Sequence, residues 1–291
     1  MIRKHSRYLS LLLLVFLAAF ASAEDHAVVV VPVANMYSSP SDNVDVVSQA
    51  ILGTNVALLE ARDEWAKIRT PDQYSGWIQM SSLHKANGSG DYGSSTPTVQ
   101  VNSLSANLYR ETDVTAHKPV ITAPFESRLE LISEATGDDG RWLKVRLPDQ
   151  TTAWIQSGDV IRDPKPLSIA ESIDLAKRFL GVTYLWGGRS SFGYDCSGFT
   201  QMLVRTRGIN MPRDADLQAA WDGMVPLERK DLQPGDLLFF GSSPASITHT
   251  GMFIGNGEFI HDTVHGHPGV QISRLADDPW TRILVACRRI K

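Results

Sequence analysis

Two six-residue stretches of this chain are similar, EWAKIR at residues 64–69 and RWLKVR at residues 141–146. A second tryptophan motif follows each copy, GWI at residues 76–78 and AWI at residues 153–155. Apolar and polar residues alternate in both copies, which is the period of a β-strand. The repeat predicts two small all-β barrels whose modest cores depend on paired tryptophans.

The composition between and after the repeats predicts where the domains end. The stretch NGSGDYGSS at residues 87–95 has linker composition. We therefore expect a first barrel at residues 24–86, a linker at 87–98 and a second barrel at 99–163. The sequence pattern changes after Pro164-Lys165-Pro166, and the new pattern continues to the last residue, 291. Whether the barrels are rigid spacers or bind a ligand stays open at this point.

The third region, residues 164–291, reads as an α+β domain. Ser168 and Glu171 have the spacing of a helix capping box, and apolar residues follow at helical spacing until Gly181. Residues 199–204 predict a second helix. Four later apolar runs predict strands, at residues 237–240, 250–254, 258–261 and 283–287. The predicted fold class is thus multidomain, with two small barrels followed by an α+β domain.

The first 23 residues predict a cleaved signal peptide. A basic stretch with Arg3, Lys4 and Arg7 precedes an apolar run at residues 9–20, and the small residues of ASA at 21–23 then suit a cleavage site. An uncleaved anchor is the alternative, but about 20 apolar residues are needed to span a bilayer. We expect an exported protein, periplasmic or secreted, with no membrane span after signal removal.

Charge and cysteine content exclude other classes. The formal net charge is −4 and the sequence has no basic run, so nucleic acid is not an expected partner. Only Cys196 and Cys287 are present, which is too few for a disulfide scaffold. The two could still pair after export, but Cys287 lies in an apolar run typical of a core strand.

Cys196 has the sequence context of a nucleophile. It stands where a Gly-rich loop becomes a helix, so backbone N–H groups would lower its pKa and favour the thiolate. A cysteine nucleophile also needs a base and a group that orients the base. His249 and His261 flank a predicted hairpin with a GNG turn at residues 255–257. The backbone N–H of Cys196 and the Tyr184 hydroxyl could stabilise an oxyanion.

The motifs of this third region, taken in order, resemble those of NlpC-type cysteine peptidases of bacterial cell walls. The resemblance covers roughly residues 168–290. It rests on YLWGG (184–188), DCSGF (195–199), Pro212-Arg213 with Gln218, LQPGDL (232–237), and HTG (249–251) with His261. It implies a papain-like fold and cleavage of peptide bonds in peptidoglycan stems.

The resemblance also implies roles for single residues. The catalytic set would be Cys196, His249 and His261, with Tyr184 as the aromatic residue beside the nucleophile. The usual Ser or Thr tract after the arginine is absent, because Asp214 follows Arg213 here.

The two barrels resemble a subgroup that cuts between γ-D-Glu and the diamino acid of free stem peptides. In that subgroup the free L-Ala amine is read by the residues that flank the cysteine, here Asp195 and Ser197. A tyrosine of the first barrel assists, and Tyr74 suits it because the second repeat has threonine there. An ordinary loop tyrosine is the alternative. Arg213 and Asp214 are either substrate-pocket residues or a surface ion pair.

Other readings stay open. An endopeptidase could cut the cross-links of intact peptidoglycan, or a degenerate domain could only bind the wall, and the fold could also serve an acyltransferase. His261, His265 and His267 could bind zinc, but their Gly- and Pro-rich loop lacks the rigidity of a metal site. We expect Trp186 to pack, the protein to be a monomer with a peptidoglycan-derived peptide as substrate, and no metal or organic cofactor.

Overall fold

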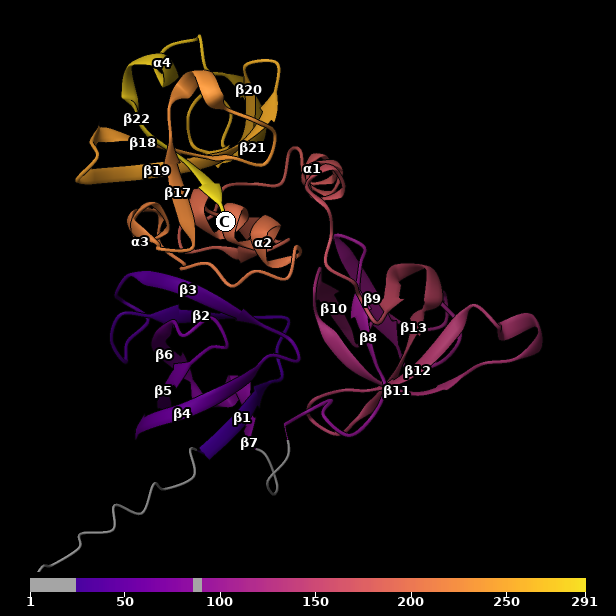
Figure 1. The fold of residues 1–291 in the computed structure, drawn as a ribbon. Helices are drawn as coiled ribbons and strands as arrows, with labels where there is room; N and C mark the ends of the chain where they lie inside the picture. Colours follow the sequence, from indigo (N-terminus) through magenta and orange to yellow (C-terminus); the bar gives the residue numbers. More distant parts are fainter. Residues whose placement is uncertain (1–24, 86–90) are drawn as a thin grey trace, which may run out of the picture.

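The computed structural model describes residues 25–85 and 91–291. The predicted signal peptide at residues 1–23 and residues 87–90 of the predicted linker lie outside the described residues. The described residues form two seven-stranded sheets, a two-stranded sheet and a six-stranded sheet. Figure 1 shows the first barrel below the C-terminal domain and the second barrel beside the first. The predicted multidomain class is confirmed.

The first barrel is built from seven antiparallel strands in the order β3-β2-β6-β5-β4-β1-β7. Its strands are β1 (Asp25–Val29), β2 (Val33–Tyr37), β3 (Val46–Ile51), β4 (Asn55–Arg62), β5 (Trp65–Arg69), β6 (Ser75–Gln79) and β7 (Leu83–Lys85). The repeated sequence motif is thus strand β5, and GWI lies in its neighbour β6, as the alternation predicts.

The second barrel repeats this arrangement strand for strand, in the order β10-β9-β13-β12-β11-β8-β14. Its strands are β8 (Thr98–Val101), β9 (Ser105–Tyr109), β10 (Ile121–Pro124), β11 (Arg128–Glu134), β12 (Trp142–Arg146), β13 (Thr152–Gln156) and β14 (Val160–Arg162). Tyr37 meets Trp65 edge-on at 5.4 Å between ring centroids, and Tyr109 meets Trp142 in the same way at 5.7 Å. Both barrels therefore conserve one aromatic contact.

The C-terminal domain has a six-stranded sheet, ordered β17-β22-β18-β19-β20-β21, with helices on both of its faces. Its helices are α1 (Ile169–Arg178), α2 (Cys196–Arg205), α3 (Ala215–Ala220) and α4 (Trp280–Ile283). Its strands are β15 (Arg189–Ser190), β16 (Gly193–Tyr194), β17 (Met224–Leu227), β18 (Leu237–Ser243), β19 (Ser246–Gly255), β20 (Glu258–Thr263), β21 (Gly269–Arg274) and β22 (Leu284–Ile290).

Local sequence explains where the first two helices of this domain begin. Ser168 and Glu171 form the predicted capping box of α1. Helix α2 begins at Cys196, three residues before the predicted start, because Asp195 caps it by accepting the Gly198 N–H at 2.7 Å. The apolar face of α2 contributes Phe199 and Leu203, both fully buried, to the core between helices and sheet.

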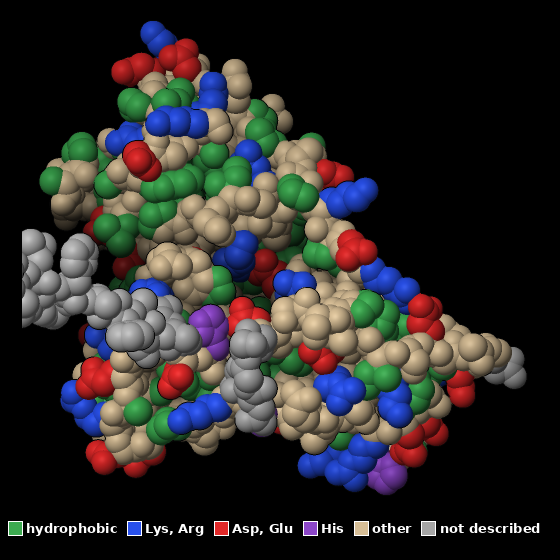
Figure 2. Space-filling view, turned by 60° about the horizontal axis from the view of Figure 1, so that its bottom comes forward, with side chains coloured by type: hydrophobic (Ala, Val, Ile, Leu, Met, Phe, Trp, Pro, Cys, Tyr) green, Lys and Arg blue, Asp and Glu red, His purple; other side chains and the backbone are tan. Residues whose placement is uncertain are grey.

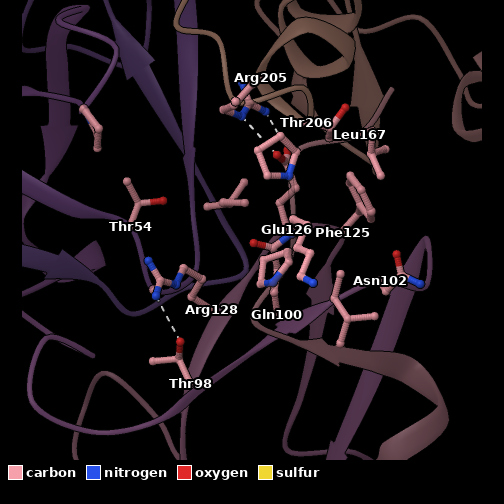
Figure 3. Close-up of a pocket in the computed structure, with 18 of the residues that line it drawn as sticks. Thr54, Thr98, Gln100, Asn102, Phe125, Glu126, Arg128, Leu167, Arg205 and Thr206 are labelled. Atoms are coloured by element: carbon pink, nitrogen blue, oxygen red, sulfur yellow. Dashed lines mark hydrogen bonds and ion pairs between the residues drawn. The ribbon is translucent and has the colours of Figure 1, made fainter. Parts of the chain in front are cut away.

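The three domains enclose a cavity of about 760 Å³ where they meet. Figure 2 shows this region as a hollow between the barrels in which cationic and anionic side chains gather. Arg205 at the end of α2 reaches across it to Glu126 of the second barrel, with Nε–Oε1 and Nη2–Oε2 distances of 3.0 and 2.6 Å (Figure 3). On the opposite wall Arg128 donates to Thr98. The helix that begins at Cys196 thus ends on the second barrel.

Candidate active site

Cys196 is the first residue of α2, and its side chain is buried at the junction of the helix with β19. The backbone N–H groups of Thr250 and Ser197 stabilise its sulfur. Thr250 directly follows His249 on β19, so the backbone of His249 passes next to this sulfur. The structure thus brings the strand that carries His249 beside Cys196.

The two histidines are hydrogen-bonded to each other. His249 Nε2 lies 2.7 Å from His261 Nδ1, and His261 Nε2 lies 2.9 Å from the Ser273 hydroxyl. This arrangement leaves only Nδ1 of His249 free to accept a proton. Ser273, on β21, was missed by the sequence reasoning because β21 itself was not predicted. β21 pairs with β20, and Ser273 is opposite Phe259, which is two residues before His261 and so lies on the same face of the sheet. If β21 had been predicted, strand alternation would have placed Ser273 on this face.

Aromatic rings enclose both imidazoles. Trp280 of α4 stacks on His249 at 5.3 Å between ring centroids and meets His261 edge-on at 4.7 Å. Phe240 of β18 lies 5.6 Å from His249. Burial among these rings lowers the pKa of His249 to about 4 and the pKa of His261 well below its usual range. Both imidazoles are therefore neutral at pH 7, as a general base requires.

The predicted lowering of the cysteine pKa is wrong for the free protein. Burial, followed by the nearby Asp195 carboxylate, raises the pKa of Cys196 to about 12. The N–H groups of Thr250 and Ser197 oppose this shift without reversing it. The helix N-terminus was visible in the sequence, whereas burial of the sulfur is a tertiary property. The resting pair is therefore a neutral thiol beside a neutral imidazole.

Arg213 is a core residue and not half of a surface ion pair. It is 2% exposed, and its Nη1 and Nη2 atoms lie 2.9 and 2.7 Å from Oδ1 and Oδ2 of Asp195. Nη1 also donates to the Ser197 hydroxyl at 2.8 Å, and Nε lies 3.3 Å from the Ser48 hydroxyl of the first barrel. The backbone N–H of Gly187 is a further donor to Asp195. The acid that flanks the nucleophile is thus fully occupied by protein donors.

Tyr74 reaches the site from the first barrel. Its hydroxyl lies 3.2 Å from Oδ2 and 3.4 Å from Oδ1 of Asp214, the residue before α3. Burial and the Asp214 carboxylate raise the pKa of Tyr74 to about 12, so the phenol donates this hydrogen bond. Burial also raises the pKa of Asp214. Among the described residues no ion pair to Asp214 is formed, but the Arg213 charge acts to lower its pKa and so opposes part of the effect of burial.

Tyr184 borders the nucleophile. It is half-buried, and burial, with Cys196 and Asp195 nearby, raises its pKa, so its hydroxyl is neutral. Trp186, two residues on, is 70% exposed, contrary to the predicted packing role. A Cβ at Gly187 would lie 2.5 Å from the Val46 carbonyl oxygen, so the backbone here packs against β3 and the indole turns outward.

Two buried polar residues lie beneath the site. Asp262, next to His261 on β20, is 0% exposed, and neither carboxylate oxygen has a hydrogen-bond partner among the described residues. Thr250, also fully buried, has an unpartnered hydroxyl. Burial, with Asp195 as a second cause, raises the pKa of Asp262 to about 8. No sequence pattern indicates this group, because an aspartate that follows a histidine on a strand is not unusual.

Three further observations concern other parts of the chain. Cys287 is buried in a core cluster, and both cysteines are free thiols. In residues 25–85 and 91–291 no group of three His, Cys, Asp or Glu side chains could hold a metal ion; His265 instead contacts Trp280. No helix in this same part of the chain has the length and hydropathy to cross a membrane.

Three family models match separate parts of the chain. They are a bacterial dipeptidyl-peptidase SH3 domain at residues 36–83, a GW (Gly-Tryp) dipeptide domain at residues 94–160 and the NlpC/P60 family at residues 181–289. The three matches fall on the first barrel, the second barrel and the C-terminal domain, respectively.

Two curated relatives are gamma-D-glutamyl-L-lysine dipeptidyl-peptidases. The one from Bacillus cereus (strain ATCC 10987 / NRS 248) is 32% identical over 229 residues, which are 74% of this chain. The match spans 66% of that relative's length, just under two thirds. The one from Bacillus subtilis (strain 168) is 30% identical over 260 residues, 86% of this chain and 82% of the relative.

A solved structure agrees with these relatives. The crystal structure of an NlpC/P60 family protein from Bacillus cereus ATCC 10987 superposes with a TM-score of 0.78 at 27% identity. The superposition covers 91% of this chain and 99% of that one, so both barrels are included. With the fold, the cysteine–histidine geometry and these matches in agreement, the chain belongs to the NlpC/P60 family of cysteine peptidases.

Proposed function

We propose that this protein is an exported cysteine peptidase that hydrolyses peptidoglycan stem peptides with a free N-terminal L-Ala, at the bond between γ-D-Glu and the diamino acid. One observation carries the specificity: the Tyr74 hydroxyl of the first barrel lies 3.2 Å from Oδ2 of Asp214, a carboxylate that forms no ion pair among the described residues. A carboxylate beside a phenol hydroxyl suits an ammonium group. The names of the two Bacillus relatives support the same bond.

In this proposal Cys196, His249 and His261 are the catalytic set. Nδ1 of His249 takes the thiol proton while the sulfur of Cys196 attacks the γ-carbonyl carbon. His261 accepts the Nε2–H of His249, and the Ser273 hydroxyl fixes the tautomer of His261 that allows this. His249 then protonates the leaving amine, and water hydrolyses the thioester. The raised pKa of Cys196 favours proton transfer in step with attack over a resting thiolate.

The oxyanion is stabilised by groups beside the nucleophile. The backbone N–H of Cys196 lies at the N-terminus of α2, where its donor has no partner in the helix. The neutral hydroxyl of Tyr184 is the second donor. No step of this mechanism requires a metal or an organic cofactor.

For the L-Ala amine we propose a binding site other than the one that the resemblance implies. The family resemblance placed the L-Ala amine on Asp195 and Ser197, but Arg213 and two backbone N–H groups already occupy the Asp195 carboxylate. We therefore assign the amine to Asp214 and Tyr74. Asp195, Ser197 and Arg213 form the buried floor on which the nucleophile and this pocket rest.

This pocket excludes stems that are still attached to glycan. In such stems the L-Ala nitrogen is an amide, which carries no charge to pair with Asp214 and continues into a bulky chain. We propose the predicted domain limits of 24–86, 99–163 and 164–291 for the mature protein, with the signal peptide at residues 1–23 directing export to the periplasm or the medium.

The test is mass spectrometry of two peptides incubated with the mature protein. One is L-Ala-γ-D-Glu-diaminopimelate with a free amine, and the other is its N-acetylated form. We expect cleavage of the free peptide alone, and none by Cys196→Ala. Equal cleavage of both peptides would keep the peptidase but remove the amine pocket. Cleavage of intact sacculi at the rate of the free peptide would favour the cross-link endopeptidase.

A further inference from the structure

Tyr74 belongs to a rigid turn between β5 and β6. The Thr70 N–H donates to the Tyr74 carbonyl at 2.9 Å, and the Gln73 N–H donates to the Thr70 carbonyl at 2.8 Å. The Thr70 hydroxyl lies 3.1 Å from the same Tyr74 carbonyl and 2.5 Å from Oδ1 of Asp72. Gln73 holds a left-handed conformation, with φ of 67°. Because the turn is closed on itself, a shift of Asp72 moves Tyr74 with it.

Asp72 is fastened to the C-terminal domain. Its Oδ2 accepts from Gln201 Nε2 at 2.9 Å and lies 3.8 Å from Nε of the buried Arg189. The Asp72 side chain is only 6% exposed. Burial acts to raise its pKa, but the Arg189 charge and the hydrogen bonds from Thr70 and Gln201 hold the pKa below its usual value. The carboxylate is therefore charged and fully engaged at neutral pH.

The partners of Asp72 connect it to the nucleophile. Gln201 lies on α2, the helix that begins at Cys196, and its side chain also donates to the Met211 carbonyl at 2.9 Å. Gln49 of β3 adds a further contact between the first barrel and the C-terminal domain, because it accepts the Arg189 backbone N–H at 3.0 Å. Through Asp72, the turn that carries Tyr74 and the helix that carries Cys196 share one buried polar network.

The second barrel contains the same turn without this network. Pro148-Asp149-Gln150 repeats Pro71-Asp72-Gln73, and Gln150 has nearly the same φ, 71°. Asp149 is exposed, and among the described residues its carboxylate accepts only from the hydroxyl and the N–H of Thr151 in the same turn, at 2.6 and 3.0 Å. The turn therefore forms without a partner in another domain. The contacts of Asp72 with the C-terminal domain are therefore not needed for the turn to form.

We propose that Asp72 is a positioning residue that sets substrate selectivity: its clamp to Gln201 and Arg189 holds Tyr74 against Asp214. This inference rests on the proposed function. A single tyrosine–carboxylate hydrogen bond is too weak to hold one domain against another, whereas a buried, charge-assisted network two residues away is strong and directional. Without the clamp the amine pocket loses one wall while the Cys196–His249 pair stays in place.

The experiment compares Asp72→Ala with its repeat-matched control Asp149→Ala. The steady-state kinetics of both use the free and the N-acetylated L-Ala-γ-D-Glu-diaminopimelate peptides. For Asp72→Ala we expect KM for the free peptide to rise about tenfold with kcat within about twofold, because misplacing a binding group weakens substrate binding. The preference for the free over the acetylated peptide then falls by the same factor. Asp149→Ala should match the wild type.

Asp72→Asn separates positioning from general stability. Asparagine keeps the shape and an acceptor for Gln201 but loses the attraction to Arg189, so we expect a smaller rise in KM, about threefold. This variant also supplies the comparison if Asp72→Ala melts below the assay temperature, which a thermal melt of each variant shows. An unchanged selectivity in folded Asp72→Ala and Asp72→Asn, or an equal loss of kcat on both peptides, overturns the inference alone. A wild type without preference for the free peptide overturns the proposed function, and the inference with it.

Discussion

The two barrels share their strand order, their aromatic contact and a Pro-Asp-Gln turn, yet only the first contributes to the candidate active site. The first barrel meets the C-terminal domain through β3 and the turn that holds Asp72 and Tyr74. The second meets it through the turn after β10, where Phe125 joins the core of that domain and Glu126 binds Arg205. The same fold thus presents different edges to one partner.

One pair of equivalent positions shows how this difference arose. Gly53 and Glu126 occupy the same turn, and both have positive φ, 82° and 69°. A Cβ at Gly53 would lie 2.2 Å from the Arg128 carbonyl, so glycine lets the first barrel touch the second. The left-handed conformation of Glu126 costs about 1 kcal/mol, and its side chain forms the ion pair that holds α2. The first barrel forms a wall of the site, and the second braces the domain behind it.

The largest effect is expected from Asp214→Asn, which keeps the shape of the amine pocket and removes its charge. We expect kcat/KM for the free stem peptide to fall about 100-fold, because an ammonium group loses its only carboxylate partner in a partly buried site. Steady-state kinetics on the free and N-acetylated peptides measure it. If both peptides lose activity equally, Asp214 supports the fold of the site and does not read the amine.

Glu126→Ala tests the bracing role of the second barrel. It leaves the partly buried Arg205 without its carboxylate, so we expect a loss of about 2 kcal/mol in the free energy of unfolding. Glu126→Gly loses the same ion pair but relieves the left-handed strain, and should be about 1 kcal/mol more stable than Glu126→Ala. Urea titration measures both. Selectivity between the two peptides should not change. A change would mean that the second barrel also affects substrate selectivity and does not only stabilise the C-terminal domain.

The sequence was sufficient for those features that depend on local pattern. Period-2 alternation predicted the barrels, the Ser168–Glu171 spacing predicted the start of α1, and the GNG turn brought His249 and His261 onto paired strands. Each of these is decided by residues that are near one another in the chain or by a visible repeat. The roles assigned to single site residues stay predictions.

Features decided by contacts between distant segments could not be read in this way. Arg213 and Asp195 form a buried pair across 18 positions, and nothing in either motif indicates it. The two copies of the Pro-Asp-Gln turn are identical in sequence, yet only Asp72 is buried against another domain. The pKa of Cys196 was misjudged for the same reason, since burial outweighs the local effect of the helix N-terminus.

Tyr74→Phe sharpens the comparison at a single hydroxyl. Phenylalanine keeps the ring but cannot donate to Asp214, so we expect kcat/KM for the free peptide to fall about tenfold. Thr151→Ala removes the equivalent side chain of the second barrel, where threonine contacts only its own turn, and should leave the kinetics unchanged. Equal effects of the two substitutions would mean that the barrels act on the site through stability alone.

Asp262→Asn is expected to have the smallest effect on activity, less than about twofold, because Asp262 is fully buried and its carboxylate oxygens hydrogen-bond to none of the described residues. Its effect on stability depends on pH. Burial raises the folded-state pKa to about 8, above that of the unfolded chain, so the folded state binds more protons between these values. The contribution of Asp262 to the stability of the wild type therefore falls as pH rises from about 4 to about 8.

Asparagine cannot ionise, so Asp262→Asn should escape this decline. Its Tm advantage over the wild type should grow from about pH 4 to about pH 8 and then level off, as thermal melts across that range would measure. A constant Tm difference would mean that Asp262 is ionised throughout. A changed preference between the free and acetylated peptides would contradict the role given to the first barrel. It would mean that a residue of the C-terminal domain alone determines part of the selectivity.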